Sequence, residues 1–135
     1  MGPVSSSVAR VDFLGTGNAF CPSGRMHALA ILDEKILIDA PPTILAQMRR
    51  ANISTGKVEH ILFTHWHGDH AFGFPFLILD RKYITDPSAS KILAVHHRPG
   101  GMEYLFNLSV LGFPGSLEDF LESRIFWNDK ESGIL

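Results

Sequence analysis

The stretch Thr64-His65-Trp66-His67-Gly68-Asp69-His70 carries the strongest signal in this sequence. Four of its side chains are of types that bind metal ions in proteins: His65, His67, Asp69 and His70. Residues two apart in an extended segment point to the same side, so the imidazoles of His65 and His67 can both reach one cation. Nitrogen and carboxylate ligands together favour zinc, with manganese or iron as alternatives.

Gly68 divides the motif, because glycine permits a sharp reversal of the chain. We therefore expect Asp69 and His70 to turn away from the first pair and to suit a second cation beside the first. A simpler interpretation is a pair of surface histidines followed by a helix-capping aspartate. The density of ligand-type residues directly after an apolar strand favours the metal site.

The rest of the chain predicts strands that alternate with helices. Apolar patterning indicates strands over residues 8–14, 26–32, 35–39, 61–64, 91–95 and 124–127, with a tight hairpin at Asp33-Glu34. Pro41-Pro42 can open a helix, and further helices are indicated over 102–111 and 117–121. Residues 72–79 also have helical character, although Gly73 and Pro75 weaken that prediction. This alternation predicts an α/β layered fold.

Composition limits the class of protein. The chain has 135 residues, of which 45% are hydrophobic and 19% are charged, which fits one folded domain over 8–135 after a flexible tail at 1–7. A net charge of −2 provides no basic field for nucleic acid. Cys21 is the single cysteine, so an internal disulfide is excluded and a reducing compartment is expected. With no secretory signal and no apolar run near the ~20 residues of a membrane helix, we expect a cytoplasmic protein without membrane association.

The histidine motif resembles the signature of the metallo-β-lactamase superfamily. Phe13-Leu14-Gly15-Thr16-Gly17-Asn18-Ala19-Phe20 resembles the N-terminal loop of ribonuclease Z and its relatives. Ile36-Leu37-Ile38-Asp39 is similar to the strand before the metal loop, and Arg98-Pro99-Gly100-Gly101 also fits the ribonuclease Z-like branch. The similarity runs from residue 9 to about residue 125. It implies the N-terminal half of an αββα sandwich, a mixed sheet with flanking helices.

The resemblance also implies roles for the motif. His65 and His67 would bind the first metal, Asp69 and His70 the second, and Asp69 would also orient or deprotonate the attacking water. Metal-dependent hydrolysis of a phosphodiester, in RNA or a cyclic nucleotide, is the implied activity, with a lactone or other ester as alternatives. Asp39 would hold one of the metal ligands in place from behind, or would merely cap a turn at the strand end.

Two departures from the family pattern stand out. The family has glycine soon after the Asp39 position, whereas this chain continues Ala40-Pro41-Pro42. In addition, the remaining metal ligands of these enzymes come from a second half of the sandwich. His96-His97 is the one other pair that could be considered for these remaining ligands, but a polar strand end is the favoured interpretation. We therefore expect a truncated domain whose site is completed by a missing C-terminal half or by a homodimer. A non-catalytic metal-binding or interaction module is the alternative.

Overall fold

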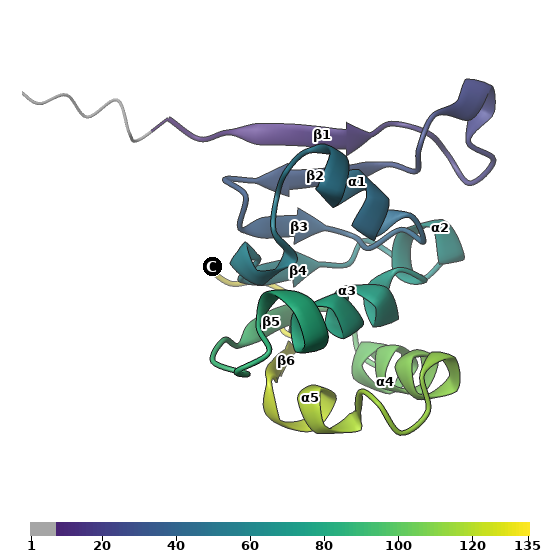
Figure 1. Ribbon diagram of the computed structural model, residues 1–135. Coiled ribbons are helices and arrows are strands. Elements are labelled where there is room, and N and C mark those ends of the chain that lie inside the picture. Colours follow the sequence, from purple (N-terminus) through teal and green to yellow (C-terminus); the bar gives the residue numbers. More distant parts are fainter. Residues whose placement is uncertain (1–7) are drawn as a thin grey trace, which may run out of the picture.

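The computed structural model describes residues 8–135, which form a six-stranded mixed sheet. The strands lie side by side in chain order (Figure 1). The second strand is antiparallel to the first and to the third, and the third to the sixth are parallel to one another. Their bounds are β1 Val11–Gly15, β2 Leu29–Leu32, β3 Ile36–Ile38, β4 His60–Leu62, β5 Leu93–His96 and β6 Ile125–Asn128. The tail expected over residues 1–7 lies outside the described residues.

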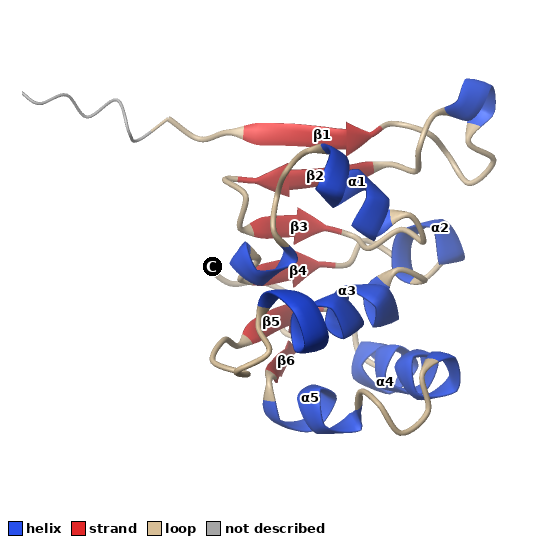
Figure 2. Cartoon of the chain, in the orientation of Figure 1, coloured by secondary structure: helices blue, strands red, loops and turns tan. Residues whose placement is uncertain are grey.

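The larger helices cover one face of this sheet. Figure 2 shows α1, α3, α4 and α5 on the same side of the strands, and α2 beyond the carboxyl ends of β3 and β4. The bounds are α1 Ile44–Arg50, α2 Gly68–Ala71, α3 Phe74–Asp80, α4 Gly101–Gly112 and α5 Glu118–Ser123. Helix α3 runs directly into a π-helical turn, Arg81–Thr85, and short 3-10 turns lie at Pro22–Gly24 and Thr55–Lys57. The result is one sheet with one helical layer.

The hydrophobic core lies between the sheet and this helical layer. Alternate strand side chains point to opposite faces, and in the central strands those on the helical side are buried. Leu37, Ile61 and Val95 from neighbouring parallel strands are each 0% exposed. They belong to the same buried cluster as Met48 of α1 and Leu77 of α3. The outer face of the sheet contributes nothing to this cluster.

The predicted order of strands and helices is confirmed, with shifted boundaries. The hairpin at Asp33-Glu34 forms through left-handed backbone at both residues, with φ of 52° and 59°. The helix weakened by Gly73 and Pro75 is present as α3, because the proline sits in its first turn, where no backbone N–H partner is needed. Helix α1 begins at Ile44, two residues after the proline pair expected to open it.

Within residues 8–135, no helix combines the length and apolar character needed to cross a lipid bilayer.

Candidate metal centre

The histidine motif lies at the carboxyl end of β4, where the parallel strands of the sheet finish (Figure 1). The ring centroids of His65 and His67 are 5.0 Å apart, as expected for residues two apart in an extended segment. His70 lies against His65, with 3.9 Å between their ring centroids. The structure therefore brings the three imidazoles into one compact cluster, instead of turning the second pair away from the first.

Asp39 joins this cluster from the end of β3. Its carboxylate is buried, 4% exposed, and accepts three hydrogen bonds. The Thr64 backbone N–H donates to Oδ1 at 2.7 Å, while the Thr64 hydroxyl and His70 Nδ1 donate to Oδ2 at 2.6 Å and 2.8 Å. Asp39 thus holds both the loop that enters the motif and one of the motif's imidazoles.

Thr64 extends this network to His65. Since its hydroxyl proton is directed at Asp39, Thr64 Oγ1 is free to accept from His65 Nδ1, which lies 3.1 Å away. One carboxylate therefore places the ring protons of both His65 and His70 on Nδ1, through Thr64 in the first case and directly in the second. In the neutral form of each ring, Nε2 is then the nitrogen that can bind a metal.

A nitrogen of His70 and a carboxylate oxygen of Asp69 face each other, and in this tautomer both are hydrogen-bond acceptors. His70 Nε2 lies 3.2 Å from Asp69 Oδ2, although the ring proton is already committed to Asp39. Two acceptors at this distance repel unless a proton or a metal cation lies between them. Three imidazoles and a carboxylate are the donor types that zinc takes, so these residues fit such a cation. Within residues 8–135, however, no three His, Cys, Asp or Glu side chains already have metal-binding geometry.

Gly68 serves a different purpose from the expected chain reversal. It is the first residue of α2 and is not among the glycines with positive φ. A Cβ built there would lie 2.7 Å from the ring of Phe72, so packing against that ring excludes a side chain. The Phe72 N–H, one helical turn later, donates to the Gly68 carbonyl at 3.0 Å and holds the motif's second half in α2.

The missing glycine after Asp39 is compensated at Asp39 itself. Its φ of 68° places this residue in the left-handed region, which aspartate tolerates better than most residues. The turn that follows packs on Gly73, whose N–H donates to the Ala40 carbonyl at 2.8 Å. A Cβ at Gly73 would lie 1.9 Å from the Pro41 carbonyl oxygen. The prolines are therefore accommodated by a glycine in the following segment.

The other histidines stay outside the cluster. His96 Nε2 is 3.0 Å from His60 Nδ1, and His97 Nδ1 donates to the Arg98 carbonyl at 2.8 Å. Sequence reasoning missed the part played by Thr64, which only the approach of β3 to the motif reveals. It also missed Tyr104 of α4, whose hydroxyl donates to the carbonyl of Trp66 at 2.9 Å and supports the motif loop.

Comparison with known proteins agrees with this geometry. The ribonuclease Z of Listeria welshimeri is 33% identical over 129 residues, covering 91% of this chain and 40% of the relative. The short form of human tRNase Z matches with a TM-score of 0.68 and 22% identity, over 89% of this chain and 44% of that chain. Zn²⁺-bound PqqB of Methylobacterium extorquens matches with a TM-score of 0.55 and 13% identity, over 90% and 48%.

The fold is that of the N-terminal half of a metallo-β-lactamase fold protein, and the expected ribonuclease Z-like similarity is confirmed. Residues 9–100 match the family model described as Anti-Pycsar protein Apyc1, and the chain belongs to that family. The chain spans about 40% of the length of the Listeria ribonuclease Z that it matches.

Proposed function

We propose that this chain is the metal-binding half of a metal-dependent phosphodiester hydrolase. The observation that carries the proposal is the Asp39 network, which leaves Nε2 of His65 and of His70 as the nitrogens that can bind a metal, with His70 Nε2 beside Asp69. A network that fixes imidazole tautomers in this way is typical of metal sites, where the partner of the other ring nitrogen orients each ligand.

In this proposal His65 and His67 hold one cation and Asp69 and His70 hold a second. Zinc is the proposed metal, supported by the donor set and by the zinc-bound PqqB match, with manganese or iron as alternatives. When bound, the metal supplies a water of lowered pKa and stabilises negative charge that develops on the substrate. Asp69 orients the attacking water or takes its proton. Asp39 keeps His65 and His70 in position from the Nδ1 side of each ring, through Thr64 for His65 and directly for His70.

The proposed substrate is a phosphodiester, in RNA or in a cyclic nucleotide. Relatives named ribonuclease Z support this substrate class. The net charge of −2 gives this half no general attraction to RNA, so we expect RNA contacts to depend on another part of the protein. The expected cytoplasmic location stays a prediction.

The motif does not by itself supply a full set of catalytic ligands. Catalytic zinc normally takes three protein ligands, whereas His65 and His67 provide two for the first cation. A further segment of a longer protein or a second copy of this chain would complete the set. The alternative function is a non-catalytic metal-binding or interaction module, and it rests on the incomplete ligand set of the motif.

Native mass spectrometry in zinc-containing, chelator-free buffer tests the proposal, because it reports metals per chain and chains per particle together. We expect about one or two tightly bound zinc ions per chain, with at least one lost in the His65→Ala/His67→Ala double variant. His27→Ala is the matched control, since this histidine lies near the Ala19 carbonyl, outside the cluster. Equal zinc content in wild type and double variant would eliminate the site.

Hydrolysis of bis(p-nitrophenyl) phosphate then separates the two functions. Zinc-dependent hydrolysis that disappears in the double variant and survives His27→Ala supports the hydrolase. Zinc binding that is lost in the double variant, without hydrolysis by the wild type, supports the non-catalytic module.

A further inference from the structure

The stretch that joins β4 to α2 has few hydrogen bonds to its backbone. Within residues 8–135, the Thr64 N–H donates to Asp39 Oδ1 at one end, and the His67 carbonyl accepts from N–H groups of α2 at the other. Between these two points, the Trp66 carbonyl is the one backbone group of residues 8–135 with a partner, and it accepts from the Tyr104 hydroxyl at 2.9 Å. The conformation of this stretch therefore depends on a side chain of α4.

The Trp66 ring anchors the same stretch from the core side. It packs against the hydrophobic core and stacks on the ring of Tyr104, with centroids 5.1 Å apart and an interplanar angle of 30°. It also lies 5.5 Å from the ring of Phe63, which is itself buried. Neighbouring residues of an extended segment point to opposite sides. A Trp66 ring held on the core side therefore keeps His65 and His67 together on the other side.

Among the three clustered imidazoles, the ring of His67 takes part in no hydrogen bond with residues 8–135. Asp39 and Thr64 hold the other two rings at Nδ1. The direction of the His67 ring therefore depends on its backbone. The Trp66 carbonyl belongs to the planar peptide group that ends at the Cα of His67. The bond from Tyr104 thus fixes the plane from which this imidazole departs.

Helix α4 provides a fixed support because its first turn is locked to the sheet. A Cβ built at Gly101 would lie 2.7 Å from His97 Nδ1, so the helix begins in direct contact with the residue that follows β5. The chain enters the helix through Gly100, whose φ of 88° is in the left-handed region. Tyr104 lies in the first turn, where its N–H donates to the Gly100 carbonyl at 3.1 Å. Its hydroxyl therefore reaches the motif from a defined position.

We propose that Tyr104 is a positioning residue for His67, and that zinc binding is coupled through it to the docking of α4. The coupling rests on the zinc site proposed above, in which His65 and His67 hold one cation. Both rings must face the same ion, and the Tyr104 bond holds His67 beside His65 before the ion binds. Because such a coupling is reciprocal, bound zinc also holds α4 more firmly against the motif.

A merely structural role for Tyr104 predicts different results. The hydroxyl would then only satisfy a carbonyl, and its loss would lower the stability of the chain without acting on a particular histidine. A positioning role acts on His67 and leaves His65 and His70 in place, because Asp39 and Thr64 still hold those two rings.

Tyr104→Phe tests the position of His67 on metal-free protein, in buffer containing chelator. The variant keeps the ring that stacks on Trp66 and removes only the hydroxyl. Nuclear Overhauser effects between imidazole protons report which rings are close. We expect the effect between His65 and His67 to be lost, while the effect between His65 and His70 stays as in wild type. Retention of both effects in Tyr104→Phe would overturn the proposal, whether or not the chain binds zinc.

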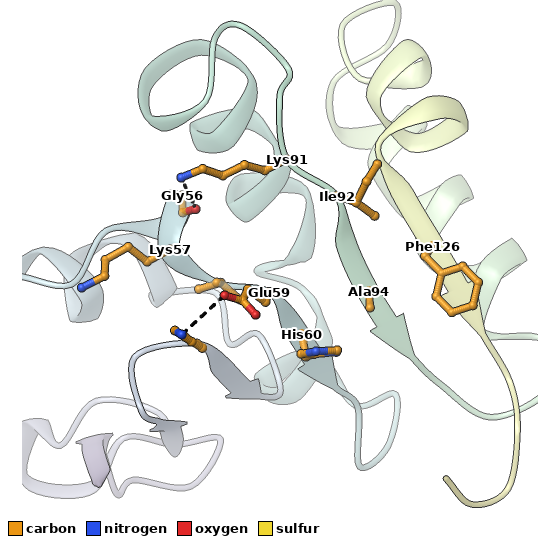
Figure 3. Close-up of a pocket in the computed structure, with 10 residues that line it drawn as sticks. Gly56, Lys57, Glu59, His60, Lys91, Ile92, Ala94 and Phe126 are labelled. Carbon is orange, nitrogen blue, oxygen red and sulfur yellow. Dashed lines mark hydrogen bonds and ion pairs between the residues drawn. The ribbon is translucent and has the colours of Figure 1, made fainter. Parts of the chain in front are cut away.

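Tyr83→Phe is the matched control. Tyr83 is the only other tyrosine of the chain, is 54% exposed and lies in the π-helical turn after α3. His60 serves as the internal reference, since Figure 3 shows it in a hollow beside Ala94 and Phe126, away from the motif. Unchanged His60 signals show that the sheet is intact in each variant.

Zinc competition against a chromophoric chelator then measures the coupling. We expect the zinc affinity of Tyr104→Phe to be at least about 10-fold below that of wild type, and that of Tyr83→Phe to be unchanged. Equal affinity in Tyr104→Phe and wild type would refute the coupling. Absence of zinc binding by the wild type would refute the proposed zinc site and the coupling with it, whereas the metal-free experiment still decides the position of His67.

Hydrogen exchange of α4 supplies the reciprocal measurement. We expect zinc to slow exchange of the α4 amides in wild type and in Tyr83→Phe, and to slow it less in Tyr104→Phe. The same zinc-induced protection of α4 in all three proteins would contradict a coupling through the Tyr104 hydroxyl.

Discussion

Asp39→Asn is the substitution that tests the candidate centre most directly. The asparagine Oδ1 can still accept from the Thr64 backbone N–H, as the carboxylate does at 2.7 Å. The other end of the side chain becomes an NH₂ group, where Oδ2 now accepts from the Thr64 hydroxyl and from His70 Nδ1. The hydroxyl can turn and accept, but His70 can accept only if its proton moves to Nε2.

The expected losses of stability and of zinc affinity follow from this change in hydrogen bonding. Two of the three bonds to Asp39 lose their charge, and weaker neutral bonds replace them. Since the group is 4% exposed, solvent does not compensate, and we expect the metal-free variant to lose about 2 kcal/mol of unfolding free energy. The moved proton occupies the nitrogen that would bind metal, so zinc affinity should fall about 10–100-fold, the usual effect of removing a ligand's hydrogen-bond partner.

Three measurements on Asp39→Asn separate these effects. Zinc competition against a chromophoric chelator gives the affinity, urea unfolding of the metal-free protein gives the stability, and ¹⁵N NMR of His70 gives the tautomer. Asp33→Asn is the control, because within residues 8–135 that carboxylate accepts only an exposed backbone bond, from Arg10 N at 2.8 Å. A stability loss with unchanged zinc affinity and an unchanged His70 tautomer would refute the reasoning and leave Asp39 as a turn residue.

Three further outcomes are expected. Gly73→Ala should lose at least about 2 kcal/mol in urea unfolding, since the new methyl would meet the Pro41 carbonyl; an unchanged midpoint would contradict the close packing. Ile61→Ala, at a 0% exposed site, should lose about 2–5 kcal/mol, yet the folded variant should bind as much zinc as wild type. Burial and the charge of His60 lower the pKa of His96 below 6.5, so the unfolded chain binds more protons between the two pKa values. Stability should therefore be full above about pH 6.5 and fall below it, and His96→Gln should flatten this dependence in urea unfolding.

Local signals were sufficient to predict the order of elements. Apolar patterning identified each strand, and the short Asp33-Glu34 connection identified the hairpin. The ends of the strands were less predictable: β1 begins at Val11, where it pairs with Leu32, although its apolar pattern starts earlier. A strand ends where its partner ends, and the partner's length is not a property of the strand's own residues.

The candidate site, too, was predictable only where its residues are close in sequence. His65 and His67 were predictable because they are close in sequence, and their spacing alone brings the rings together. The role of Asp39 was left open between a turn and a ligand support, because His70 lies 31 residues away from it in the chain. The contact between His96 and His60 was not predicted at all, since it depends on the register between parallel strands.

The one-sided core has a consequence for synthesis on the ribosome. Leu37, Ile61 and Val95 are completely buried by helices that lie within the same 135 residues. This segment can therefore acquire its packed interior as soon as it leaves the exit tunnel. The sheet face without helices is exposed during that interval, which is when the segment is most open to misassembly.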